Sequence, residues 1–254
     1  MRKLDLTQQL NMLFSSNSKL GTVVALLIFA ILHKSCSPGC SEQRMALAQR
    51  LQSKYSAEAL EYYAQIAFGT EFGKGSNDFL LRWHKDVKIK VFGKPKYATD
   101  SLALINVVKE LNEIIEPITI SFTTGDDYNV RFDYTSIFEM EKVYPLHEDD
   151  HSVLPARFRV SGFFGKIRKA QIVIIDEARD AIRVASIWEE VTQILGLMQD
   201  RDTHLESIFY ESSAIRRYNE KFAEIDKELI RIHYNEDLPN MDKGEFIEMF
   251  KCQP

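Results

Sequence analysis

The sequence predicts an α+β fold in which a twisted mixed sheet of about five strands packs against helices. Short segments with alternating apolar and polar residues are typical of half-buried strands, and longer segments with apolar residues three or four apart are typical of helices. The two patterns follow one another as strand, helix, several strands and helix. With 254 residues and a hydrophobic share of 45%, the chain can form one mid-sized domain with additional segments.

Strands and helices are expected in a definite order along the chain. Alternation predicts strands at residues 87–91, 118–122, 129–134, 158–164 and 171–175. Apolar residues at helical spacing predict helices at residues 41–68 (one or two helices), 99–116, 180–195 and 214–234. The helix before Pro117 can be capped by Thr99, Asp100 or Ser101, and the next helix starts at Asp180 or Ala181. Three parts follow: an N-terminal segment at 1–40, a helical lead-in at 41–75 and the main domain at 76–254.

The N-terminal segment resembles an export signal. An uncharged apolar run, residues 20–32, follows Lys19 and other basic residues, and it is shorter than the roughly 20 residues of a membrane span. Acylation of Cys36 would make the chain a bacterial lipoprotein, and Cys40 is a second candidate. An uncleaved anchor, an ordinary signal peptide and a buried helix are the alternatives. We expect a cell-envelope location, either membrane-attached or periplasmic or extracellular.

Composition excludes some functions. The net charge of −5 argues against a broad attraction to nucleic acid. The three cysteines, Cys36, Cys40 and Cys252, form no spacing typical of a metal site or a disulfide framework. We therefore expect neither feature, and we expect a peptide or an envelope protein as partner rather than nucleic acid.

The predicted helix at 180–195 has the layout of a zinc-protease helix without its histidines. In the H-E-x-x-H motif, two histidines one helical turn apart bind zinc and the glutamate is the general base. With the longer spacing H-E-x-x-H-x-x-G-x-x-H, the ligand positions fall on Glu189, Gln193 and Gln199. The general base falls on Glu190 and the glycine on Gly196. An ordinary surface helix, apolar on one face and polar on the other, is the competing interpretation.

On a helix of the zinc-protease type, the side chains at the ligand positions would lie close together. Glu189 and Gln193 are four residues apart and point the same way. Gly196 suits a left-handed turn that brings Gln199 and Asp200 back towards them. Amide oxygens are poor zinc ligands, so we expect no bound metal or other cofactor; the alternatives are zinc, or calcium held by carboxylates of Glu189, Asp200 and Asp202.

Other candidate groups have simpler interpretations. The cluster His147-Glu148-Asp149-Asp150-His151 suits a solvated turn better than a metal site. We expect His233 to be packed or solvated and His84 to lie at the edge of a strand. Ser207 and Ser212 have no histidine and aspartate pattern that would indicate a hydrolase triad.

Several segments resemble a bacterial family, domain-of-unknown-function family 2927. They are Glu189-Glu190-Val191-Thr192-Gln193-Ile194-Leu195-Gly196-Leu197, Glu206-Ser207-Ile208-Phe209-Tyr210, residues 222–234, and Leu238-Pro239-Asn240-Met241. Residues 66–73 and Arg82-Trp83 are similar to its lead-in, so the resemblance covers about residues 62–241. It implies a zincin-like, metzincin-like fold, with Met241 where metzincins have a methionine turn. Asn240 replaces the glycine of that turn.

Two functions are compatible with these features. The first is a membrane-associated, non-catalytic domain, a degenerate metalloprotease whose remnant cleft binds a peptide or partner. The alternative is an atypical metal-dependent peptidase in which Glu190 is the general base and Glu189, Gln193 and Gln199 or Asp200 are ligands. A purely structural envelope protein is a third possibility.

Overall fold

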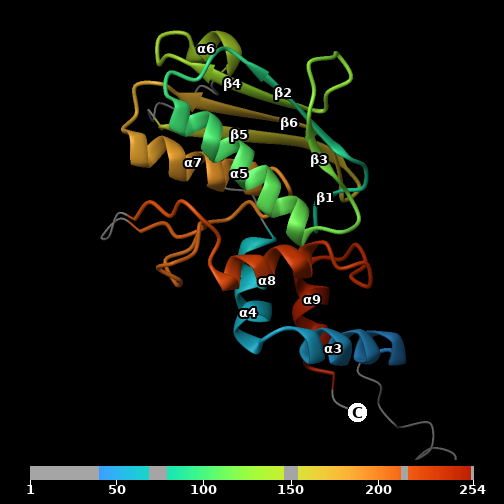
Figure 1. Cartoon of the computed structure of the whole chain (residues 1–254). Helices are drawn as coiled ribbons and strands as arrows, with labels where there is room; N and C mark the ends of the chain where they lie inside the picture. The colour runs from blue at the N-terminus through green and yellow to red at the C-terminus, as the bar shows by residue number, and fades with distance from the viewer. Residues whose placement is uncertain (1–39, 69–78, 146–153, 213–216, 253–254) are drawn as a thin grey trace, which may run out of the picture.

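The fold has a sheet with helices on one face and a separate group of helices at one end (Figure 1). The computed structural model describes residues 40–68, 79–145, 154–212 and 217–252. The predicted export signal, Cys36 and the cluster at 147–151 lie outside these residues. Among the described residues, no helix is both long enough and apolar enough to cross a membrane.

Six strands form one mixed sheet, which confirms the predicted fold class. They are β1 (Arg82–Trp83), β2 (Val87–Phe92), β3 (Ile120–Phe122), β4 (Val130–Thr135), β5 (Ala156–Phe163) and β6 (Lys166–Ile175). The main order is β1-β6-β4-β2-β3, and all of these pairs are parallel. β5 pairs with β6 in the antiparallel direction, through a tight turn at Phe164 and Gly165, both of which have positive φ.

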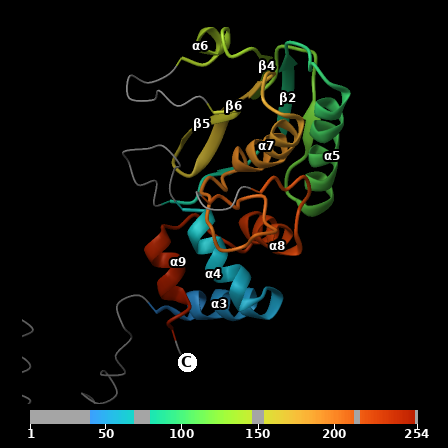
Figure 2. The same ribbon diagram turned by 90° about the vertical axis from the view of Figure 1, so that its left-hand side faces the viewer.

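The long helices α5 (Ala98–Ile114) and α7 (Asp180–Gln193) lie on the same side of the sheet (Figure 2). Because successive side chains of a strand point to opposite faces of the sheet, Ile89, Phe132 and Ile172 point into the core. The opposite face carries Lys90, Arg131 and Gln171 on the same three strands. A four-residue helix, α6 (Met140–Val143), covers Val173 and Ile175.

A buried ion pair fixes α5 against α7. Arg183 is 2% exposed, and its Nε donates to both carboxylate oxygens of Asp100, at 3.2 and 3.1 Å. Its Nη2 also donates to Asp180 at 2.7 Å. Because removal of one partner leaves the other charge buried, such a pair strongly constrains how the two helices pack.

The helical group at the end of the sheet combines both ends of the described chain. It contains α3 (Glu42–Lys54), α4 (Ala57–Ile66), α8 (Glu224–His233) and α9 (Lys243–Met249). The hydroxyls of Ser41 and Ser56 cap α3 and α4, which confirms two helices within residues 41–68.

The helix predicted at residues 214–234 starts later than expected. α8 begins at Glu224 rather than near residue 214, because the Asp226 carboxylate accepts a hydrogen bond from the Ala223 N–H at 2.9 Å and closes the N-terminus there. The sequence prediction also missed α9, which is only seven residues long and is capped by Asp242.

A disulfide joins Cys40 to Cys252, across 212 positions of the sequence. The expectation that the cysteines form no disulfide was therefore wrong. Spacing could not reveal this bond, because α3 and α9 meet only in the folded protein. In the oxidised protein Cys40 has no thiol for acylation, so the second acylation candidate is also wrong.

The disulfide should contribute strongly to stability. We expect replacement of both cysteines, Cys40→Ser with Cys252→Ser, to lower the free energy of unfolding by about 2–5 kcal/mol, because the closed loop restricts the unfolded chain. Urea unfolding of the two proteins measures the change. A reducing agent should lower the wild-type midpoint and leave the variant unchanged; equal midpoints under oxidising conditions would contradict the bond.

Candidate functional site

The polar residues of the motif lie on α7 but do not line an open face. Glu189 is half-buried, whereas Glu190 is 8% exposed and Gln193 is 1% exposed. Ser186 and Thr192 are also buried. The apolar stripe packs into the core as expected. The competing interpretation, an ordinary surface helix with a solvated polar face, does not hold for Ser186, Glu190 and Gln193, which are buried. Asp200, beyond the helix, contacts Gln193 on that face.

The turn after α7 has the predicted geometry. Gly196 has a φ of 114°, and a Cβ atom there would lie 1.8 Å from the carbonyl oxygen of Leu81. Beyond the turn, Asp200 comes back to the helix and accepts a hydrogen bond from Nε2 of Gln193 at 3.0 Å. The sequence therefore predicted correctly that Gly196 brings Asp200 towards Gln193.

The third ligand position, Gln199, makes different contacts. Its backbone N–H donates to the carbonyl oxygen of Ile66 at 3.2 Å, which joins the turn to α4. Its side-chain Oε1 accepts from Nη1 of Arg201 at 3.3 Å, and the same Nη1 donates to the carbonyl oxygen of Asp200 at 2.6 Å. A guanidinium group therefore lies beside the position of a third ligand.

These residues do not fit a zinc ion. The Gln193 amide presents its NH₂ group, a donor, to Asp200, and the Gln199 oxygen faces the cation of Arg201. Zinc sites use thiolate, imidazole or carboxylate ligands. Within the described ranges, no three His, Cys, Asp or Glu side chains are grouped as metal ligands, so Glu189, Asp200 and Asp202 form no calcium-type cluster either.

Side chains from distant elements hold the C-terminal end of α7. The last carbonyl groups of a helix have no partner within the helix. Nε1 of Trp83 donates to the carbonyl oxygen of Ile194 at 2.8 Å, and the Tyr234 hydroxyl donates to that of Leu195 at 3.1 Å. Nε2 of His233 lies 3.1 Å from the carbonyl oxygens of both Leu195 and Leu81.

His233 is a buried structural residue, which confirms the packed interpretation. With two carbonyl oxygens as partners, its Nε2 must carry the proton and donate. Nδ1, 3.0 Å from the Tyr63 hydroxyl, is then the acceptor. Burial lowers the pKa of His233 to about 3, so the ring is neutral at physiological pH. His84, by contrast, is exposed and directly follows β1, as expected.

Ser207 belongs to a buried network that the sequence did not reveal. Its hydroxyl donates to Oδ1 of Asp226 at 2.5 Å and accepts from the Tyr62 hydroxyl at 3.1 Å. Oδ2 of Asp226 accepts from the Ile208 N–H at 3.2 Å. Burial raises the pKa of Asp226 to about 6. Ser207 and Asp226 both lie in segments that carry the family resemblance. That shared membership was the only hint in the sequence that the two residues interact.

This network is structural rather than a hydrolase site. Ser207 is 0% exposed, so no substrate can reach its hydroxyl. Met241 is also buried, and its carbonyl oxygen accepts from the Leu80 N–H at 3.0 Å. Asn240 is not among the residues with positive φ, so a glycine is not required before Met241.

Comparisons with known proteins identify a family and a distant structural likeness. A sequence model of the family described as "Protein of unknown function (DUF2927)" matches residues 56–251. No curated protein matches the chain significantly. Two structures of myroilysin are similar, each with a TM-score of 0.39. One is 11% identical and covers 61% of this chain and 82% of that chain; the other is 12% identical and covers 68% and 95%.

The buried aspartate and histidine should affect stability in opposite directions as the pH changes. The folded pKa of His233, about 3, lies below its ordinary 6.5, so its contribution is lost as the pH falls below 6.5. The folded pKa of Asp226, about 6, lies above 3.8, so its contribution is lost as the pH rises from 3.8 through 6. Between pH 6 and 4 the two effects offset each other.

Asp226→Asn should therefore expose the effect of His233. We expect the free energy of unfolding of the variant to fall more steeply than that of the wild type as the pH is lowered from 6 to 4, by up to about 1.4 kcal/mol per pH unit. Urea unfolding at several pH values measures both slopes. Asp202→Asn, at an exposed position, is the control and should follow the wild type. Parallel curves for Asp226→Asn and wild type would refute the assignment.

Proposed function

We propose that this chain, which belongs to the DUF2927 family, is an exported, membrane-attached binding domain without peptidase activity. One observation carries the proposal: Gln193 and Gln199, at two of the ligand positions, hydrogen-bond to Asp200 and Arg201 instead of presenting oxygens to a shared ion. The motif helix then serves to hold the core together, and the binding site lies elsewhere.

The burial of Glu190 supports the non-catalytic interpretation. A general base must reach the water molecule that it activates, within hydrogen-bonding distance of a bound substrate. Glu190 is 8% exposed, and the neighbouring Gln193 is 1% exposed. So small an exposed fraction leaves little of the Glu190 side chain accessible to a peptide.

The disulfide supports export. Disulfides persist in oxidising compartments outside the cytoplasm and are rare in reducing ones. Cys40 is the last residue of the predicted N-terminal segment at 1–40, and its bond to Cys252 is of the kind that persists in such a compartment. Attachment to the membrane by this segment, with or without acylation of Cys36, is part of the proposal.

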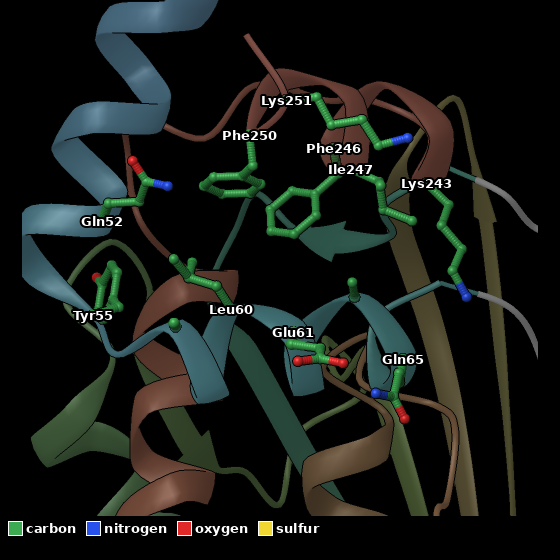
Figure 3. Close-up of a pocket in the computed structure, with 12 residues that line it drawn as sticks. Gln52, Tyr55, Leu60, Glu61, Gln65, Lys243, Phe246, Ile247, Phe250 and Lys251 are labelled. Carbon is green, nitrogen blue, oxygen red and sulfur yellow. The ribbon is translucent and has the colours of Figure 1, made fainter. Parts of the chain in front are cut away.

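An apolar groove between helices is the best candidate for partner binding. The cavity, about 740 Å³ in volume, lies between α3, α4 and α9 (Figure 3). Leu60, Phe246 and Phe250 form its apolar wall, and Ile247 beside them is 38% exposed. Its volume lies within the range of small-ligand sites, which are mostly apolar with a few polar groups.

The chemistry of the groove favours an amphipathic helix with acidic residues as its occupant. Grooves between helices bind such helices through apolar side chains three or four positions apart. Lys243 of α9 lies on one wall of the groove and Glu61 of α4 on the other, while Lys251, just after α9, is paired with Glu248 at 2.6 Å. A peptide with acidic residues beside its apolar stripe would complement Lys243.

The absence of catalysis can be tested with the purified chain. We expect less than one zinc per chain by metal analysis of protein prepared without chelators, and no cleavage of a denatured protein substrate, because the ligand positions are engaged in hydrogen bonds. Glu190→Gln should leave both results unchanged. One zinc per chain, together with cleavage that Glu190→Gln abolishes, would establish the peptidase alternative instead.

The groove can be tested with a displayed library of helical peptides. We expect the selected peptides to have an apolar stripe with acidic residues, and Ile247→Lys to weaken their binding about tenfold or more, because a charge replaces a central apolar contact. Leu102→Lys, on an exposed apolar residue of α5, is the matched control. Equal binding to wild type and Ile247→Lys would remove the groove as the site.

A further inference from the structure

The face of the sheet opposite α5 and α7 carries a row of polar side chains across four strands. Lys90 of β2 is the partner of Arg131 of β4, Arg131 is the partner of Gln171 of β6, and Gln171 is the partner of Arg159 of β5. Partners on adjacent strands point to the same face. Three cations and one amide therefore lie side by side across the sheet.

The neighbouring row adds another cation. Lys169 lies two residues before Gln171 on β6 and so points to the same face, opposite its partner Ser161 of β5. Lys169 and Arg159 are both exposed. Together with Arg131 they line a cavity of about 430 Å³ that also includes Tyr128 and Asn129.

The two arginines are held in fixed positions. Arg131 donates through Nε and Nη2 to Asp133, at 2.7–3.0 Å, and its guanidinium stacks 4.1 Å from the centre of the Phe92 ring. The guanidinium of Arg159 lies 4.8 Å from the centre of the Tyr144 ring and donates to Oε1 of Gln171. Because few rotamers remain to be lost, a ligand would meet preorganised donors.

The charge of this cavity is unusual for the chain. The whole protein has a net charge of −5. The cavity has three cations, Arg131, Arg159 and Lys169, and one carboxylate, that of Asp126, which is paired with Lys90 at 2.7 Å. The buried carboxylate of Asp133 forms an ion pair with Arg131 and neutralises its charge. The positive charge of Arg159 and Lys169 is therefore left for a ligand.

We propose that this cavity, the basic pocket of the sheet, binds a phosphate-bearing anion. Guanidinium groups match the geometry of phosphate oxygens, and a lysine adds a point charge. A group with more than one negative charge suits cations that approach from two strands. The site is separate from both the motif helix and the groove, so it would add a second ligand to the binding function proposed above.

The test measures binding of tripolyphosphate and of inorganic phosphate by calorimetry at low ionic strength. We expect tripolyphosphate to bind, with inorganic phosphate weaker, and Lys169→Gln to weaken tripolyphosphate about fivefold. Lys109→Gln, the same change of charge at an exposed residue of α5, should have no effect. Arg159→Lys keeps the charge and loses the forked geometry, so it should also weaken binding.

Several outcomes would overturn the proposal. Absence of tripolyphosphate binding at low salt would do so, as would an equal loss in Lys109→Gln. Equal affinity for citrate, a tricarboxylate, would show that the pocket does not select phosphate. Lys169 and Lys109 are both exposed, so neither variant should disturb folding, and unfolding curves of the variants verify this.

Discussion

The hydrogen bonds at the C-terminal end of α7 connect the sheet and its helices to the group of helices at the end of the sheet. His233 of α8 accepts from Tyr63 of α4 and donates towards the carbonyl oxygens of Leu81, before β1, and Leu195, after α7. These interactions join four segments far apart in the sequence through one neutral ring. They also leave no space for a side chain at position 196, since a Cβ there would lie 2.7 Å from Nε2 of His233. Glycine at this position is thus required by packing as well as by backbone conformation.

In this arrangement, residues of the motif that resembles a protease helix take part in contacts that hold the fold together. The turn fixed by His233 returns Asp200 to Gln193 and brings Gln199 against α4, which covers the polar face of α7. The two binding sites proposed above are an apolar groove among the helices and a basic pocket on the sheet. They lie on different elements, and neither includes a residue of α7. A ligand at either place would leave the core network intact.

Local features of the structure could be predicted from the sequence, and long-range ones could not. The start of α7, the bend at Gly196 and the return of Asp200 depend on residues within about one or two turns of each other. The Ser207–Asp226 and Tyr63–His233 hydrogen bonds and the Cys40–Cys252 disulfide join residues 19, 170 and 212 positions apart. Such pairs become neighbours only through packing, which periodicity does not encode. The burial of Glu190, which is 8% exposed, also depends on tertiary packing that helical spacing alone does not specify.

The disulfide has a mechanical consequence for a chain attached through its N-terminus. Tension on the segment before Cys40 would otherwise pull only on the start of α3 and could peel that helix away from α9. Because Cys40 is covalently joined to Cys252, the same tension is shared with the end of α9, next to the groove. The two helices must therefore be displaced together. In the anchored form proposed above, this bond would keep the walls of the groove aligned under tension.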